Sequence, residues 1–312
     1  MSNAAAVFEA HRDHLTGVAY RMLGSRADAE DAVQEAWLRW NAADQAGIRD
    51  PKGWLTTVTA RICLDELRSA RVRREAYVGP WLPEPLVERL PSAEADPADR
   101  VARADQVSYA LLVVLERLTP EQRVAFVLHD LFAVPFDEVA GVLGTTSGAA
   151  RQHASRARRA LTGGSVRHTA DLAEQQRVVS AFMTAARSGD LAGLLAVLAP
   201  DVVTVGDGGG VAPAGRRPVH GAPRVARLVL GLFETYWRRA AWRRMEPVLV
   251  NGDLGFVAEV GLAGGAVWKS TFAFAVDQGR VTGVFSQLNP AKLTLVPGPR
   301  PGEDWSLPAP PG

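Results

Sequence analysis

The chain has 312 residues, a net charge of +1 and an apolar fraction of 47%. This length suffices for two or three domains with separate cores, and the small net charge excludes a molecule that is basic over its whole surface. A single cysteine, Cys63, excludes an internal disulfide and a cysteine-based zinc site. The first residues carry charges before any apolar run, and no stretch approaches the roughly 20 apolar residues that span a bilayer. We therefore expect a cytoplasmic protein with no signal peptide, no membrane contact, no metal and no cofactor.

Residues 1–78 are predicted to be helical. The segment SRADAEDAVQEAWLRWNAA places apolar residues at helical spacing, and its acidic and polar residues fall largely on the other faces. The apolar stripe consists of Ala29, Val33, Ala36, Trp37 and Trp40. A second helical segment, KGWLTTVTARICLDELRSARVRR, becomes basic toward its end, with no acid between Arg68 and Arg74.

Residues 79–100 are predicted to form a linker, because their prolines remove backbone donors and interrupt helices. Trp81, Leu82 and Leu86 make this segment too apolar for a solvated tether. We expect the linker to dock on another part of the molecule.

Residues 101–168 are predicted to be helical again and to contain a helix-turn-helix. Thr119 is the expected N-cap of one helix, followed by a proline and by Gln122 in a capping box. A short helix, a turn at Gly144–Thr146 and a basic helix from Ser147 follow. Between Ser147 and His168 there are five arginines and no acid, which favours DNA binding over an ordinary helical hairpin with a solvated face.

The remaining chain is predicted to be an α+β domain at residues 169–295 with a disordered tail at 296–312. Two helices precede alternating strands, and Asn251-Gly252 and Gln278-Gly279 mark hairpin turns in an antiparallel sheet. The tail is rich in proline and glycine.

Two of these motifs resemble the extracytoplasmic-function (ECF) sigma factors of bacterial RNA polymerase. DAEDAVQEAWLRW followed by KGWLTTVTARICLDELRSARVRR resembles region two of that family. LTPEQRVAFVLHDLFAVPFDEVAGVLGTTSGAARQHASRARRAL resembles region four, in the expected order and at the expected separation. The fold class implied is two all-α sigma domains plus an α+β domain.

The resemblance implies a role for each helical surface. The clamp helices of core RNA polymerase would contact Asp28, Asp31, Gln34, Glu35 and Leu38. The loop at 41–50 and the basic helix would melt and read the minus-ten promoter element, through Arg61, Arg68, Arg71 and Arg73. The helix-turn-helix would read the minus-thirty-five element through Ser147, Arg151, Gln152, Ser155, Arg156, Arg158 and Arg159. Taken alone, the acidic residues also fit a plain solvated helix face.

The last domain resembles the SnoaL-like branch of the nuclear-transport-factor-two-like fold, a cone with a central pocket. Three motifs carry this resemblance to the subgroup of sigma factors with such an extension: WLPEP at Trp81, Leu82, Pro83, Glu84 and Pro85, DGGG at Asp207, Gly208, Gly209 and Gly210, and NPAKL at Asn289, Pro290, Lys292 and Leu293. In the family the glycine run continues with a basic residue, whereas Val211 follows here.

The glycine run also raises the question of a phosphate-binding loop. Such a loop runs from a strand directly into a helix, but here Pro213 and Pro218 follow the glycines and the GxxxxGK[ST] pattern is missing. We therefore interpret the three motifs as parts of one regulatory joint between domains. The alternative is a plain rim loop of the cone.

Two other functions fit parts of the chain. A ligand-sensing DNA-binding regulator would use the helix-turn-helix but not the residues from Asp28 to Arg74. A cyclase or isomerase would need an acid or base in the cone, for which Asp207, His220, Tyr236 and Glu259 are candidates. The pocket of the cone is also a candidate site for a small-molecule ligand. We expect that the chain is not an enzyme.

Overall fold

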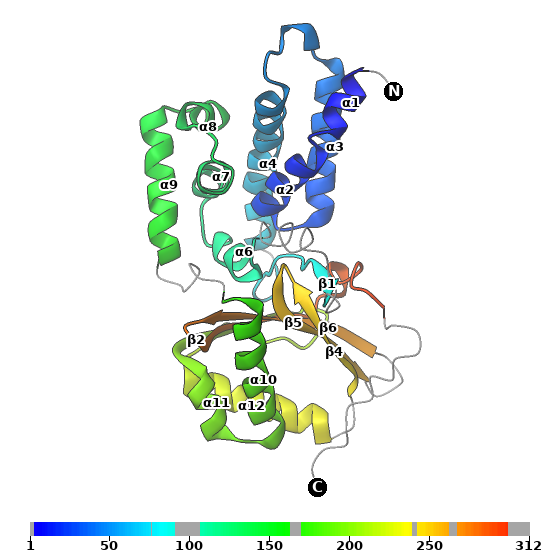
Figure 1. Ribbon diagram of the computed structural model, residues 1–312, viewed down its shortest axis with the longest axis vertical. Coiled ribbons are helices and arrows are strands. Elements are labelled where there is room, and N and C mark those ends of the chain that lie inside the picture. Colours follow the sequence, from blue (N-terminus) through cyan, green and yellow to red (C-terminus); the bar gives the residue numbers. More distant parts are fainter. Residues whose placement is uncertain are drawn as a thin grey trace. The chain divides into compact units, whose positions relative to one another are not determined.

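The computed structural model describes residues 3–75, 77–90, 107–162, 170–238, 242–261 and 267–298. The chain divides into two units, residues 1–76 with 114–164 and residues 77–113 with 165–312 (Figure 1). Within the described ranges, no helix is both long and apolar enough to cross a membrane.

The first unit is helical throughout its regular structure. Its elements are α1 (Asn3–Glu9), α2 (Arg12–Leu23), α3 (Arg26–Ala42), η1 (Gln45–Gly47), α4 (Pro51–Glu75), α7 (Pro120–Phe126), η2 (Val127–Leu131), α8 (Phe136–Leu143) and α9 (Ser147–Thr162). Helix α6 (Tyr109–Leu115) begins in the second unit and ends in the first.

Local signals in the sequence set several of these helix ends. Gly24 ends α2 with a left-handed backbone, φ 71°, and Ser25 then caps α3 by accepting a hydrogen bond from the Asp28 N–H. Thr119 and Gln122 form the expected capping box at the start of α7. The residues within a few positions of each of these helix boundaries therefore determine where the helix begins or ends.

Helices α8 and α9 form the expected helix-turn-helix. Gly144 has φ 63° and terminates α8, and the next helix starts three residues later. Helix α9 has a buried stripe, whose members are Ala150, Ala154, Ala157 and Leu161. Because three of these four residues are alanines, α9 packs closely on α7 and α8. Its polar side chains remain on the solvent-facing side.

A buried arginine ties the first unit together. Arg123 in α7 is 3% exposed, and its guanidinium donates to Leu115 O at 2.7 Å and to Met22 O at 2.8 Å. It also pairs with Glu116 at 2.6 Å. A buried charge is tolerated only when it is paired and hydrogen-bonded, so these contacts hold α7 against the ends of α2 and α6.

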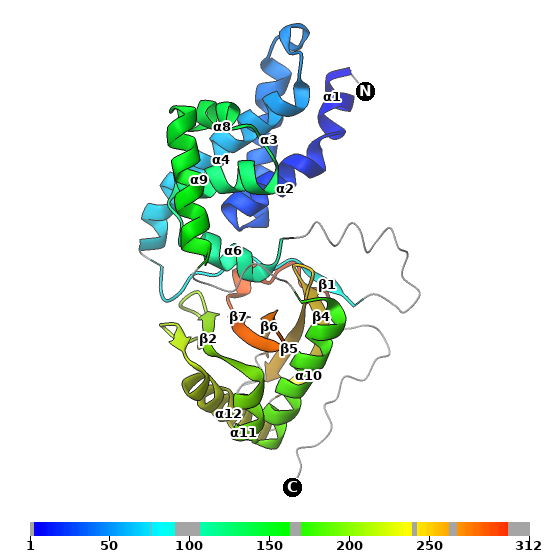
Figure 2. The same ribbon diagram turned by 60° about the vertical axis from the view of Figure 1, so that its left-hand side comes forward.

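The second unit is a seven-stranded sheet with the helices α10 to α12 on one face (Figures 1 and 2). Its strands are β1 (Val87–Arg89), β2 (Leu198–Asp207), β3 (Val219–His220), β4 (Trp242–Val250), β5 (Asp253–Gly261), β6 (Val267–Asp277) and β7 (Arg280–Gln287). They lie in the order β1-β4-β5-β6-β7-β2-β3, with β2 parallel to β7 and every other pair antiparallel. The helices are α10 (Leu172–Ser188), α11 (Leu191–Val197) and α12 (Ala222–Arg238), and η3 (Pro290–Lys292) follows the sheet.

Both predicted hairpin turns are present. Asn251 and Gly252 join β4 to β5, and Gln278 and Gly279 join β6 to β7, all four with positive φ. Two consecutive residues of this kind produce a turn whose twist matches that of the strands. The register of this part of the sheet is therefore set locally.

Three features of this unit differ from the sequence expectation. Helix α12 is a third helix, inserted between β3 and β4, and the parallel β2–β7 pair interrupts the antiparallel sheet. Part of the linker forms a strand, β1, at the sheet edge. Val296, assigned above to the tail, is 7% exposed and packs on the sheet, whereas 299–312 lie outside the described residues.

The sheet has an apolar core on each face. On one face, residues of α10, α11 and α12 pack on strand residues such as Phe274 and Val281. On the other face, Leu82 of the linker, Tyr109 of α6 and Leu293 pack on Val205 and Phe285. Alternate strand residues point to opposite faces, and β2, β5, β6 and β7 each contribute to both cores.

We predict that ionisation of Asp253 destabilises the second unit as pH rises to neutral and above. Asp253 is 5% exposed and accepts a hydrogen bond from Gln175, and burial raises its pKa to about 7. The unfolded chain ionises this carboxyl near its ordinary value of about 4, so stability is lost as pH rises from about 4 to 7. We expect Asp253→Asn to stabilise the protein by about 2 kcal/mol more at pH 8 than at pH 5, measured by urea unfolding. An equal effect at both values would contradict this prediction.

Candidate functional site

The outward face of α3 is acidic and carries one exposed apolar side chain. Asp28, Asp31 and Gln34 are exposed, and Leu38 is 57% exposed. Glu35 is half-buried and pairs with Arg39 at 3.0 Å. An exposed leucine among carboxylates is suited to a protein partner that is basic with an apolar centre.

The two described arginines on α4 contact α8 and α7. Arg61 Nη2 donates to Gly141 O in α8 at 2.9 Å. Arg68 Nη2 donates to Glu121 Oε1 in α7 at 3.1 Å. The side chains of Arg71 and Arg73 lie outside the described residues. In this arrangement both cationic groups are occupied within the first unit.

Helix α9 presents a polar surface with two kinds of side chain. Arg151, Gln152, Ser155, Arg156 and Arg159 are exposed. The other two residues predicted to contact DNA bind side chains of the protein instead. The Ser147 hydroxyl donates to Asp137, and Arg158 pairs with Asp130 at 2.6 Å. The exposed set has the donors that hold phosphates and read base edges.

The three motifs of the last domain meet at one buried carboxylate, that of Asp207. This side chain is fully buried at the end of β2. Its Oδ2 accepts from the Leu82 N–H of the linker at 2.9 Å and from Lys292 Nζ at 2.7 Å. Its Oδ1 accepts from the Tyr77 hydroxyl at 2.6 Å and from the Gly209 N–H at 2.9 Å.

Further side chains hold the linker backbone beside this carboxylate. Lys292 Nζ donates to Leu82 O at 2.6 Å, and its ammonium lies 3.9 Å from the centre of the Trp81 ring. Gln287 Nε2 donates to Pro83 O at 3.2 Å. We call Tyr77, Asp207, Gln287, Asn289 and Lys292 the linker clamp. Asn289 belongs to it because its Nδ2 donates to the Tyr77 hydroxyl at 2.9 Å.

Electrostatics make the clamp stable at neutral pH. Burial by itself raises the pKa of Asp207, but the Lys292 charge and the hydrogen bonds from Leu82, Lys292 and Tyr77 outweigh it and hold this pKa below its ordinary value. Burial and the neighbouring carboxylate raise the pKa of the Tyr77 phenol, so this group stays a donor. The stabilisation from Asp207 is complete above its ordinary pKa and is lost as pH falls through the lowered value.

Sterics explain the glycines after Asp207. A Cβ on Gly208 would lie 2.2 Å from Ala212 O, and one on Gly209 would lie 2.5 Å from the Asn289 side chain. Gly209 and Gly210 also have positive φ, 61° and 74°. The N–H of Gly209 donates to the carboxylate of Asp207. The anion that this glycine loop binds is therefore a side chain of the protein itself and not a phosphate.

The linker itself is buried along the clamp. Leu82, Pro83, Glu84 and Pro85 are buried, and the Tyr109 hydroxyl donates to Pro83 O at 2.7 Å. Pro290 is exposed, whereas Leu293 is 4% exposed in the same core as Leu82. The structure therefore brings the three sequence motifs together on one face of the sheet.

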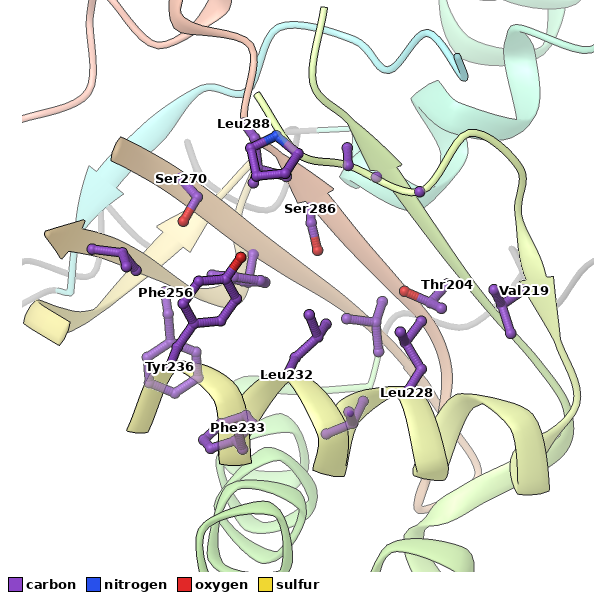
Figure 3. A pocket seen from close by; sticks show the side chains of 18 of the residues that line it. Thr204, Val219, Leu228, Leu232, Phe233, Tyr236, Phe256, Ser270, Ser286 and Leu288 are labelled. Carbon is purple, nitrogen blue, oxygen red and sulfur yellow. The ribbon is translucent and has the colours of Figure 1, made fainter. Parts of the chain in front are cut away.

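The opposite face of the sheet borders a cavity of about 210 Å³ that lies between the sheet and α12 (Figure 3). Of the four candidate catalytic residues, Tyr236 lines it. Asp207 belongs to the linker clamp, Glu259 pairs with Arg244 at 3.3 Å, and His220 is exposed on β3. The candidate acids and bases are thus not assembled around one space. Among the described residues, no cluster of three or more metal-ligating side chains occurs.

Four residues with structural roles are not predicted from the sequence: Tyr77, Tyr109, Gln287 and Arg123. Gln287 directly precedes the segment LNPAKL, and Tyr77 precedes VGPWLPEP, so both lie close to a motif. Their roles depend on partners far away in the chain, such as the 130-residue separation between Tyr77 and Asp207. A single sequence does not identify such pairs.

Comparisons with known proteins cover both units. The family model described as "Sigma-70 region 2" matches residues 7–73, and that described as "Sigma-70, region 4" matches residues 108–161. The ECF RNA polymerase sigma factor SigJ of Mycobacterium tuberculosis is 48% identical over 295 residues, which covers 93% of each chain. The probable ECF RNA polymerase sigma factor SigI of the same organism is 35% identical over 292 residues, 93% of this chain and 94% of SigI.

A solved structure agrees with the fold. The crystal structure of M. tuberculosis SigJ matches at a TM-score of 0.74 and 45% identity, over 93% of this chain and 98% of that chain. The expected fold class, two helical sigma domains and an α+β domain, is confirmed.

We predict that Asp207→Asn releases the linker. Removing one partner of a buried ion pair costs about 3 kcal/mol, so the Leu82 amide should exchange its hydrogen about a hundredfold faster in the variant. The measurement is hydrogen exchange at Leu82, with Asp201→Asn as a matched control because Asp201 lies exposed on the same strand. Unchanged exchange in Asp207→Asn would show that the apolar contacts of Leu82 hold the linker without the carboxylate.

Proposed function

The chain belongs to the ECF RNA polymerase sigma factors, and from this premise we propose that it uses three surfaces of its first unit to start transcription. The acidic face of α3 binds the clamp helices of the largest subunit of core polymerase. Helix α9 reads the minus-thirty-five element, and α4 contacts the melted minus-ten element. The protein acts in the cytoplasm and makes and breaks no covalent bond.

The exposed side chains support these assignments. On α3, Leu38 supplies an apolar contact within a row of acids that complements a basic groove. On α9, the exposed arginines neutralise phosphates while Gln152 and Ser155 lie on the same solvent-facing surface. Ser147 and Arg158 act by fixing the helix-turn-helix geometry through Asp137 and Asp130.

The described arginines of α4 must change partners before they contact DNA. Arg61 and Arg68 are bound to α8 and α7 in the free protein. The Arg68–Glu121 pair is 50% and 31% exposed, and exposed pairs of this kind contribute only about 0–1 kcal/mol. Binding to polymerase and promoter is strong enough to replace such contacts, so we propose that α4 parts from α7 and α8 during initiation.

We further propose that the second unit regulates this opening in cis. The observation that carries the proposal is the buried, ion-paired Asp207 carboxylate bound to the linker backbone. Residues 77–113 connect the α4 half of the first unit to the α7–α9 half, and they belong to the second unit. Docking of the linker shortens the free connection between these halves, which disfavours their separation.

We predict that Arg156→Ala weakens promoter binding. Loss of a base contact costs about 1–3 kcal/mol, and loss of a phosphate contact lowers the salt slope by about one. The measurement is the binding of polymerase holoenzyme to promoter DNA as a function of salt. Arg227→Ala is the control, because Arg227 is an exposed arginine on α12 in the second unit. Equal effects of the two substitutions would show that α9 does not face the promoter.

Transcription with purified core polymerase tests cis regulation. We expect Asp207→Asn to give several-fold more promoter-dependent transcript than the parent chain or Asp201→Asn, because the linker no longer restrains the first unit. A chain ending near Gly164 is compared in the same assay. Less transcript from both altered chains would make the second unit a required part of the initiation complex. If no form of the chain bound core polymerase or started RNA, the sigma-factor proposal itself would fall.

A further inference from the structure

The cavity between α12 and the sheet is too large to be a packing defect. Voids in protein interiors rarely exceed a water molecule, whereas an engineered apolar cavity of about 150 Å³ binds benzene. This cavity has about 210 Å³ and lies between α12 and the sheet (Figure 3). Its apolar walls include Phe182, Val229, Phe256 and Phe274. Such a space is stabilised by an apolar occupant.

The polar groups of the cavity select an uncharged molecule. Thr204, Ser270, Ser286 and Tyr236 bring hydroxyl groups to its surface (Figure 3). Among the described lining residues there is no aspartate, glutamate, histidine or lysine, and the single charged one, Arg217, is exposed. An ion deep in the cavity would lose its water without gaining a counter-charge. Hydroxyls satisfy one or two neutral polar groups of a ligand without a charge penalty.

The cavity is accessible from solvent along α12. Leu228 and Leu232 line it and are still 38% and 44% exposed. Pro213, Ala214 and Gly215, from the loop that follows Asp207, form another part of its lining. A molecule entering beside α12 therefore meets this loop.

The cavity and the linker clamp share two strands. Gly206 pairs with Ser286 across β2 and β7, and both line the cavity. The next pair in the register is Asp207 with Gln287, and both belong to the linker clamp. Because successive strand residues face opposite sides, one residue step separates the ligand surface from the clamp surface.

The connecting residues leave little room for independent movement. Leu288 lines the cavity, and its N–H donates to Asp207 O at 2.7 Å. A Cβ on Gly206 would lie 3.4 Å from the Ala214 Cβ, so the loop rests on β2. A ligand that displaces Leu288 displaces a residue hydrogen-bonded directly to Asp207 of the clamp. One that displaces Ala214 moves the loop that packs on Gly206, the neighbour of Asp207.

We propose that the cavity binds a small, uncharged, mainly apolar molecule with one or two hydrogen-bonding groups, and that its binding shifts the docking of the linker. This regulation rests on the proposed function, but the binding does not. The ligand is bound without being turned over, since the lining lacks a paired general acid and base. Coupling is reciprocal: the ligand changes linker docking by the same factor as linker docking changes ligand affinity.

Fluorescence titration with N-phenyl-1-naphthylamine, a neutral dye with a naphthyl and a phenyl group, tests the site on the full chain. We expect saturable binding that Leu232→Trp weakens at least tenfold, because the larger side chain fills the cavity. Leu228→Trp is the second filling variant, used if the first does not fold. Leu195→Trp is the matched control, because Leu195 is 36% exposed on α11 and does not line the cavity. Absence of binding, or equal binding in filled and control variants, overturns the site.

The sulfonated dye 1-anilinonaphthalene-8-sulfonate tests the chemistry of the ligand. We expect it to bind at least tenfold more weakly than the neutral dye, because its charge is unmatched inside the cavity. Equal or tighter binding overturns the inference of an uncharged ligand and assigns the anion to Arg217.

The coupling is tested without polymerase. The dissociation constant of the neutral dye is compared in the parent chain, Asp207→Asn and Asp201→Asn. We expect at least a threefold change in Asp207→Asn alone, and the dye should change Leu82 amide exchange in the parent chain. Equal affinities in all three chains overturn the coupling. Since neither assay involves transcription, their failure is distinct from failure of the sigma-factor proposal.

Discussion

The burial of the Asp207 carboxylate is the constraint on which the second unit depends. A charge with no exposure requires a counter-charge and donors, and Asp207 receives them from Lys292, Tyr77, Gln287 and the N–H groups of Leu82 and Gly209. Two of these partners belong to the segment that follows α4, and the others to the glycine loop and the end of the sheet. Satisfying one carboxylate thus orders the glycine loop beside it and two distant segments, 77–82 and 287–292, at once.

The two units use charges in opposite ways. In the second unit the Asp207–Lys292 pair is 0% and 14% exposed, so its disruption leaves an unpaired buried charge. In the first unit, the contacts of Arg61 and Arg68 with α8 and α7 lie near the surface, where water and other anions replace them easily. The same unit retains one buried arginine, Arg123, that holds α7 in place. The buried charged contacts therefore stabilise the fold. The weaker surface contacts hold the arginines that we propose bind DNA.

The sheet binds the linker on one face and borders the cavity on the other, because successive strand residues point to opposite faces. One face holds the linker through Asp207 and Gln287, and the other borders the cavity through Gly206 and Ser286. The candidate acids are used on the linker face or in an ion pair with Arg244, so the cavity keeps hydroxyls and apolar groups.

The sequence by itself determined what depends on neighbouring residues: the capping box at Thr119, the turn at Gly144, the apolar stripe of α9 and the two hairpins at Asn251 and Gln278. Each of these follows from spacing or from backbone preferences within a few positions, and the motifs of both sigma regions are equally local. The tertiary structure alone decided that Tyr77 and Gln287 serve Asp207, that Arg61 binds α8, and that part of the linker becomes an edge strand. These contacts join residues about 80 or more positions apart. Their pairing is fixed by sheet register and helix packing, which many distributed contacts set together and no short segment encodes.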